Sequence, residues 1–226
     1  KPWTSVAERP LTMESSFWKA RWEANQIGFH EADVHPMLLR HGALLGNEGT
    51  VFVPLCGKSL DMLWLAGQGY EVIGVELSPI AVRAFFRENK LQPARRQVGR
   101  LTEWSSGPIR IFCGDIFALT AADLGPIAAV YDRAALTALP EMARLAYVAH
   151  LHALIPETCP IFLLTAEDPE EGDGLEPEVA EELLTLYAGR FTVDLVHVAP
   201  SFQTDPEAPD APPLPIEHKF YRLLPI

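Results

Sequence analysis

Gly57 and Glu76 together have the character of a ligand-binding pair. Gly57 stands in a short polar turn, Cys56-Gly57-Lys58-Ser59, between an apolar run of strand length and a segment with helical spacing. Glu76 follows 19 residues later (76 − 57), directly after a second apolar run. In dinucleotide-binding sheets, an acid about 20 residues past a glycine turn accepts hydrogen bonds from ribose hydroxyls. The spacing therefore predicts a ligand that carries a ribose.

The turn disfavours two familiar classes of nucleotide. It lacks the G-x-G-x-x-G pattern that wraps a pyrophosphate, which argues against a dinucleotide. Gly57-Lys58-Ser59 resembles the end of a phosphate-binding loop, but that motif needs glycine at position 52, where Phe52 stands. Glu76 taken alone could be an ordinary solvated carboxylate at a strand end. Only its place in a strand–helix–strand unit favours a binding role.

Alternating strands and helices are needed to bring these residues together. Apolar runs rich in β-formers predict strands over 51–55, 71–75, 109–113, 126–131, 160–165, 191–198 and 217–224. Helical spacing and caps predict helices near 17–22, 37–45, 60–67, 79–90, 140–154 and 177–187. Strands and helices alternate up to the last two strands, which a link without a helix joins. The sequence therefore predicts an α/β fold with a mostly parallel sheet and an antiparallel hairpin at one edge.

The remaining segments read as irregular. We expect a loose arm over residues 1–13, a first helix capped by Ser15 or Ser16, and a mobile proline-rich loop over 200–215. Residues 92–107 form an irregular excursion with room for one short strand.

Several candidate residues fall at predicted strand ends, namely Leu55 to Gly57, Glu76, Asp115 and Asp132-Arg133. Ligands of open α/β sheets bind beyond the carboxyl ends of the strands, at the point where the strand order reverses. We therefore expect one ligand site at this edge.

Trp18 and Trp22 share one face of the predicted first helix, because they stand four residues apart. They could be packing aromatics of the core. Since their helix precedes the first strand, it could instead lie across the open end of the sheet, so we predict a helical lid over residues 14–45.

Composition narrows the class of protein. The 226 residues suit a single domain, 1–226, and the net charge of −12 disfavours nucleic acid and anionic lipid as partners. Three widely spaced cysteines, seven histidines without metal spacing and no apolar run of membrane-spanning length predict a cytoplasmic protein with neither disulfide nor metal. We further predict a monomer that acts on a small molecule.

A ribonucleoside cofactor without a pyrophosphate suits this chemistry, and S-adenosylmethionine fits. Its ribose would meet Glu76, its adenine would meet Asp115 and Ile116, and its sulfonium would meet aromatic faces, where a cation gains roughly 0.5–2 kcal/mol. A nicotinamide-dependent oxidoreductase and a non-catalytic nucleoside-binding protein stay open as alternatives.

Five motifs together resemble the thiopurine S-methyltransferase family: Trp18-x-x-x-Trp22, Ile27-Gly28-Phe29-His30, Pro54-Leu55-Cys56-Gly57-Lys58-Ser59, Gly74-Val75-Glu76-Leu77-Ser78 and Tyr131-Asp132-Arg133-Ala134-Ala135-Leu136. They cover about residues 14–165, and beyond 165 the likeness fades apart from the final strand. The resemblance implies a Rossmann-like class I methyltransferase fold, with helices on both faces of a seven-stranded sheet whose last strand is antiparallel. Members methylate aromatic and heterocyclic thiols with S-adenosylmethionine, and bacterial relatives are linked to detoxification of selenium and tellurium.

The resemblance also assigns residues to the cofactor. It places Trp22, Leu55, Glu76 and Arg133 there, with Trp18, Phe29, Asp115 and Ile116 as neighbours, and Gly57 and Leu77 complete the predicted set. Asp115 departs from the small polar residue of some members. The acceptor-binding residues are not identified by these motifs.

The implied reaction is an in-line displacement, in which a thiolate attacks the sulfonium methyl group while the protein holds both in place. Arg133 is the predicted catalytic residue. It could stabilise the anionic acceptor or hold the carboxylate of the cofactor. A purely structural ion pair with Asp132 or another acid is the alternative.

Overall fold

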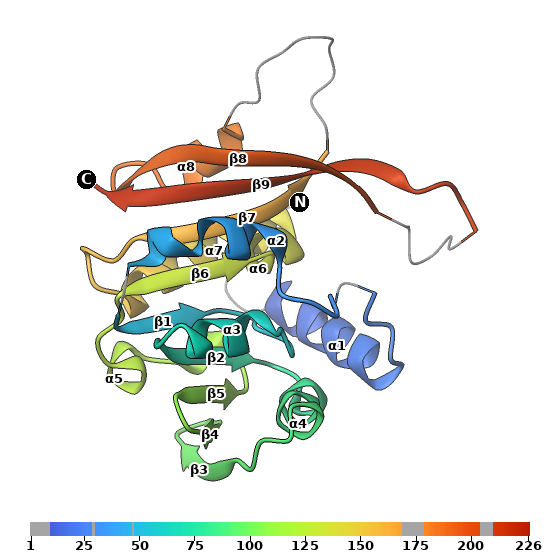
Figure 1. Cartoon of the computed structure of the whole chain (residues 1–226), viewed down its shortest axis with the longest axis vertical. Coiled ribbons are helices and arrows are strands. Elements are labelled where there is room, and N and C mark those ends of the chain that lie inside the picture. Colours follow the sequence, from blue (N-terminus) through green and yellow to red (C-terminus); the bar gives the residue numbers. More distant parts are fainter. Residues whose placement is uncertain (1–9, 29, 47, 169–178, 204–209) are drawn as a thin grey trace, which may run out of the picture.

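The protein folds around one sheet of nine strands, in the order β3-β4-β5-β2-β1-β6-β7-β9-β8 (Figure 1). The computed structural model describes residues 10–28, 30–46, 48–168, 179–203 and 210–226. The strands are β1 (Thr50–Val53), β2 (Glu71–Glu76), β3 (Ala94–Val98), β4 (Leu101–Ser106), β5 (Ile109–Cys113), β6 (Ala129–Arg133), β7 (Ile161–Glu167), β8 (Phe191–Gln203) and β9 (Leu214–Pro225).

The predicted class is confirmed, because β5, β2, β1, β6 and β7 pair in parallel, as a doubly wound sheet requires. The last strand, β9, runs antiparallel to both β7 and β8. All seven predicted strands are present. Two more, β3 and β4, extend the far edge as an antiparallel hairpin beside β5. Within the described residues the sheet therefore has nine strands, whereas seven were expected.

Helices cover both faces of the sheet. They are α1 (Pro10–Glu23), α2 (Pro36–His41), α3 (Asp61–Gly67), α4 (Pro79–Glu88), α5 (Ala121–Leu124), α6 (Ala135–Ala138), α7 (Glu141–Leu154) and α8 (Glu181–Leu186), with short 3₁₀ turns η1 (Gly42–Leu45) and η2 (Ile116–Ala118). Side chains of β1 alternate between the faces: Phe52 joins the core under α5 to α8, whereas Val51 and Val53 join the core under α2, α3 and α4. The central strands are thus buried on both sides.

Three irregular segments differ from the prediction. Residues 10–13 belong to α1, since Pro10 opens the helix and leaves Ser15 and Ser16 inside it; residues 1–9 lie outside the described residues. The excursion 92–107 contains the two strands of an edge hairpin. Strands β8 and β9 reach into the predicted loop 200–215, of which residues 204–209 lie outside the described part.

The helix at the amino terminus, α1, lies beyond the carboxyl ends of the central strands and contacts α4 and α7 (Figure 1). The role of α1 as a lid stays a prediction. Within the described residues, no helix combines the length and the apolar character that a membrane span requires.

Candidate active site

One cavity opens at the carboxyl edge of the sheet, between α1 and the ends of β1, β2 and β6. Every described residue of the predicted set lines it: Trp18, Trp22, Leu55, Gly57, Glu76, Leu77, Asp115, Ile116 and Arg133. Phe29, the remaining member of the set, lies outside the described residues. Segments that are distant in the sequence therefore meet at a single site.

The turn after β1 has an unusual backbone. Leu55 has φ +47° and Gly57 has φ +54°, both in the left-handed region, which costs a non-glycine residue about 1–3 kcal/mol. The Cys56 amide donates to the Val75 carbonyl of β2 at 2.9 Å. Gly74 makes room for this turn, because a Cβ atom there would stand 2.6 Å from Cys56 Sγ. The strained turn is thereby fixed against the neighbouring strand.

Glu76 is held by the backbone on both of its oxygens. Oε2 accepts a hydrogen bond from the Gly57 amide at 2.9 Å, and Oε1 accepts one from the Ser78 amide at 2.7 Å. The residue is only 7% exposed, so it is not the solvated strand-end carboxylate that the sequence left open. Burial raises the pKa of Glu76, and hydrogen bonds from the Ser78, Gly57 and Leu77 amides oppose that rise. A carboxylate has about four lone-pair positions, which leaves capacity for ligand hydroxyls.

The two tryptophans of α1 line the cavity beside the turn that follows β1. Trp22 is buried and Trp18 is half-buried. A Cβ atom on Gly57 would lie 3.5 Å from the Trp22 ring, so glycine lets the indole approach the turn closely. The cavity thus has an aromatic wall beside the Gly57–Glu76 pair.

The residues after β5 form the opposite wall. Asp115 is exposed and its Oδ1 accepts a hydrogen bond from the Phe117 amide at 3.0 Å, which caps η2. Ile116 is buried, and its carbonyl lies 2.9 Å from His150 Nε2. Asp115 therefore keeps its second oxygen for other partners.

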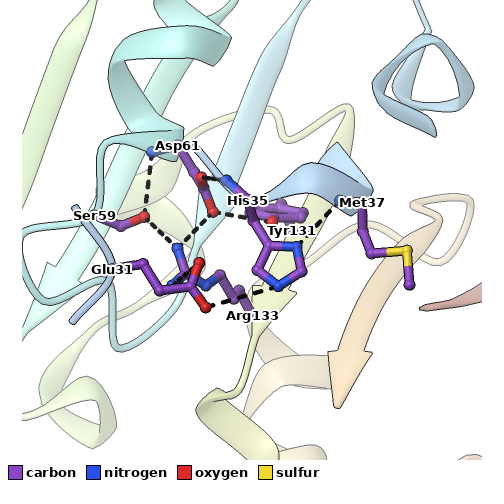
Figure 2. Close-up of polar contacts among 7 residues, drawn as sticks. All are labelled: Glu31, His35, Met37, Ser59, Asp61, Tyr131 and Arg133. Atoms are coloured by element: carbon purple, nitrogen blue, oxygen red, sulfur yellow. Dashed lines mark hydrogen bonds and ion pairs between the residues drawn. The ribbon is translucent and has the colours of Figure 1, made fainter. Parts of the chain in front are cut away.

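Arg133 is held by acids, but not by Asp132. Its Nη1 donates to Asp61 Oδ2 at 2.9 Å and to Ser59 Oγ at 3.1 Å, and its Nη2 lies 3.2 Å from Glu31 Oε2 (Figure 2). Asp132 instead caps α6, where Oδ1 accepts from the Ala135 amide at 3.0 Å. The sequence offered Asp132 or another acid as a structural partner of Arg133. Asp132 is wrong, and Asp61 and Glu31 pair with Arg133 instead.

Asp61 joins three segments at this point. It is fully buried at the start of α3, and its carboxylate also accepts hydrogen bonds from the His35 amide at 2.8 Å and the Tyr131 hydroxyl at 3.0 Å (Figure 2). Because Asp61 bonds to Arg133 as well, the guanidinium is fixed relative to α3, β6 and the residue that precedes α2.

Sequence reasoning missed several residues of the site. The cavity is also lined by His30, Lys58, Ser59, Phe117, Tyr131 and Ala134. Tyr131 and Ala134 belong to one of the five motifs named above, and their closeness to Arg133 in the sequence is a signal that could have found them. The sequence held no comparable signal for Asp61 and Glu31, because they lie 72 and 102 residues from Arg133 (133 − 31 for the second).

Residues 13–224 match the profile of the family described as thiopurine S-methyltransferase (TPMT), well beyond the span 14–165 over which the motifs suggested a likeness. A relative from Stutzerimonas stutzeri named "Thiopurine S-methyltransferase" is 50% identical over 210 residues, which cover 91% of this chain and 88% of that protein.

Two solved structures with similar folds are named as methyltransferases. One is the 1,6-didemethyltoxoflavin-N1-methyltransferase of Burkholderia thailandensis with bound S-adenosylhomocysteine: TM-score 0.59, 20% identity, 99% of this chain and 92% of that chain. Another is a SAM-dependent methyltransferase from Anabaena variabilis: TM-score 0.61, 15% identity, 100% of this chain and 97% of that chain. At such low identity these likenesses show the fold alone.

Proposed function

This chain belongs to the thiopurine S-methyltransferase family, and on that premise we propose that it transfers a methyl group from S-adenosylmethionine to the sulfur of aromatic or heterocyclic thiols. The observation that carries the proposal is the buried Glu76 carboxylate beside the Gly57 turn, in a cavity walled by Trp18 and Trp22. Neither an oxidoreductase nor a simple nucleoside-binding protein accounts for the family membership.

The residues of the cavity fit S-adenosylmethionine. Glu76 keeps acceptor capacity for ribose hydroxyls after binding two backbone amides. Asp115 and Ile116 offer an acid and an apolar surface for the adenine. Trp18 and Trp22 offer π faces, which attract a cation such as a sulfonium. Apolar walls with a few converging polar groups are typical of small-molecule sites.

When bound, S-adenosylmethionine supplies an electrophilic methyl carbon on a positively charged sulfur. The chain's own task is to hold an ionised thiol in line with that carbon, which can account for most of the rate enhancement of a displacement. Heterocyclic thiols ionise readily near neutral pH, so no strong protein base is required. The acceptor sulfur would form a bond to the methyl carbon while the bond between that carbon and the sulfonium sulfur breaks. The acceptor would leave as an S-methyl thioether, and the sulfonium would become the neutral thioether of S-adenosylhomocysteine.

Arg133 is the proposed catalytic residue. Its Nη1 is fixed by Asp61 and Ser59, which orients the guanidinium at the wall of the cavity. A guanidinium can pair with an anionic acceptor or with the carboxylate of the cofactor. Both roles are proposed for Arg133. They predict different effects of substituting Arg133 on the affinity for the cofactor, so an experiment can separate them.

A calorimetric titration with S-adenosylmethionine, S-adenosylhomocysteine and NAD tests which cofactor the protein binds. We expect both adenosyl compounds to bind and NAD not to bind. Binding of NAD in preference to S-adenosylhomocysteine would contradict the proposal. We further propose that the chain acts as one cytoplasmic, monomeric domain on a small-molecule acceptor, with neither nucleic acid nor membrane as partner.

A further inference from the structure

One histidine of the cavity has no role in the proposed function. His30 belongs to the loop between α1 and α2, and it lines the cavity. Lys58 and Arg133 line the same cavity. His30 is half-buried, so it can contact a bound molecule and still exchange a proton with water. An ionisable side chain in such a place can take part in the chemistry of the acceptor.

The imidazole ring of His30 is available to a ligand. The His30 backbone amide donates a hydrogen bond to the Ile27 carbonyl at 2.8 Å. Within the parts of the chain that the structure describes, the ring itself takes part in no hydrogen bond and no ion pair. Two other histidine rings differ: that of His35 caps α2, and Nε2 of His150 lies 2.9 Å from the Ile116 carbonyl. The neutral ring of His30 therefore keeps one nitrogen that can accept a proton.

The surroundings of His30 keep its ring neutral near pH 7. Burial, followed by the charge of Lys58, lowers the pKa of His30 below its ordinary value of 6.5; Glu88 opposes this shift and Arg133 adds to it. Glu88 also forms an ion pair with Lys58 at 2.8 Å. The neutral form is the one that acts as a base. The two cations that disfavour an imidazolium would at the same time favour an anion in the cavity.

We propose that His30 is the general base for acceptors that enter the cavity as un-ionised thiols. The inference rests on the proposed methyl transfer, because it concerns the proton that such an acceptor must lose. The S–H bond breaks, the proton binds to the free ring nitrogen of His30, and the electron pair left on sulfur forms the bond to the methyl carbon. The bond between that carbon and the sulfonium sulfur breaks, so a neutral thioether and an imidazolium result. The half-buried imidazolium then releases its proton to water.

This role concerns the range of acceptors. An aromatic thiol with an electron-withdrawing substituent is already a thiolate near neutral pH, so it gains nothing from a base. A thiol with an electron-donating substituent keeps its proton, and only its small ionised fraction could react without a base. A base in the cavity makes the un-ionised fraction reactive as well. His30 should therefore matter more as the acceptor becomes a weaker acid.

The test compares 4-nitrothiophenol with 4-methoxythiophenol, two acceptors of similar shape. At about pH 6 the first is ionised and the second is mostly protonated. We expect His30→Gln to lower kcat/KM for 4-methoxythiophenol by about 3- to 10-fold, because a thiol one pH unit below its pKa is only about one-tenth ionised. The value for 4-nitrothiophenol should change by less than about 2-fold. At about pH 8.5, where both thiols are ionised, the loss with 4-methoxythiophenol should disappear.

The matched control is His197→Gln. His197 is also half-buried, but it lies on β8 outside the cavity, with Nε2 3.3 Å from Arg40 Nη1. This variant should leave kcat/KM for both thiols unchanged.

A second measurement does not need turnover. In a complex with S-adenosylhomocysteine, which has no methyl group to transfer, the absorption spectrum of the bound acceptor distinguishes a thiol from a thiolate. At about pH 6 we expect 4-methoxythiophenol to absorb as a thiolate in the wild type and as a thiol in His30→Gln.

Several results would overturn the role of His30 as a base. Equal kcat/KM of wild type and His30→Gln for 4-methoxythiophenol would do so, and an equal loss with both thiols would make His30 a structural residue. A thiolate spectrum that persists in His30→Gln would assign the ionisation to the nearby cations instead. If the spectra differ as expected but the wild type transfers no methyl group, His30 accepts the proton and the proposed function fails.

Discussion

The Gly57 amide donates a hydrogen bond to Glu76 Oε2 at 2.9 Å, so the turn after β1 and the end of β2 share one buried carboxylate. A second amide, that of Ser78, accounts for the other oxygen. The same acid thereby shapes the wall of the cavity and offers its remaining lone pairs to a ligand. Glu76 therefore has a structural role in the turn and a proposed role in binding the ligand.

Replacing Glu76 should therefore affect both properties. We expect Glu76→Ala to weaken binding of S-adenosylhomocysteine by about 1.5–3 kcal/mol, the range for hydrogen bonds to a charged group. The melting temperature should fall as well, because two amides lose their acceptor. Glu103→Gln is the control: Glu103 is buried on β4 and pairs with Arg96 and Arg110, outside the cavity. Normal affinity of Glu76→Ala with a lowered melting temperature would make Glu76 purely structural.

The helix α1 should behave as a lid. We predict that residues 14–30 exchange their amide protons quickly without ligand and slowly with S-adenosylhomocysteine, since Trp18 and Trp22 would gain contacts with it. Hydrogen exchange with and without the ligand measures this. The strand β9, none of whose residues lines the cavity, serves as the internal reference. Equal protection of residues 14–30 in both states would make α1 a fixed part of the core.

Stability should fall as the pH falls from about 6.5 toward 4, because His35 and His152 each have a folded pKa lowered to about 4 by burial. The unfolded chain takes up their protons first in this window. Asp132 acts in the opposite sense, because burial raises its pKa to about 6. The contribution of the protonated Asp132 to the free energy of unfolding is therefore lost as the pH rises through that value. His35→Asn should flatten the dependence of melting temperature on pH. Equal slopes in variant and wild type would rule out His35 as a source.

Arg133 should matter for turnover on either of its proposed roles. We expect Arg133→Ala to lower kcat/KM for an aromatic thiol by roughly 10- to 150-fold, and Arg133→Lys to recover part of it, since lysine keeps the charge but loses the planar fork. If Arg133 holds the acceptor, affinity for S-adenosylhomocysteine should change much less. A parallel collapse of that affinity would identify Arg133 as a cofactor ligand. Melting temperatures control for the buried Asp61, which loses its cation.

The sequence predicted the central strands well because each is a short, buried, β-rich run. The strand at the edge of the sheet was not predicted, because a strand with few buried residues has no apolar run. Strand β3 is mostly exposed and basic, and its partner β4 holds it through Arg95 over the Trp104 ring, 4.4 Å from the ring centroid, and through the Arg96–Glu103 pair. Both contacts cross the hairpin, so neither is visible in one strand.

The candidate site divides in the same way. Residues at strand ends, such as Glu76 and Arg133, could be predicted because the topology of a parallel sheet gathers strand ends at one edge. Their partners could not. Asp61 and Glu31 reach Arg133 from other segments, and an acid in a helix or a loop carries no sign of what it will contact. The tertiary fold alone supplies that information.

Transfer of an isotopically labelled methyl group to a thiol is the decisive test of the proposed activity. The protein is incubated with methyl-labelled S-adenosylmethionine and a heterocyclic thiol such as a thiopurine, and the product is analysed by mass spectrometry. We predict a labelled S-methyl thioether and one equivalent of S-adenosylhomocysteine, both strongly reduced in Arg133→Ala. Binding of S-adenosylmethionine without any labelled thioether, across a panel of aromatic and heterocyclic thiols, would contradict S-methyl transfer by this protein.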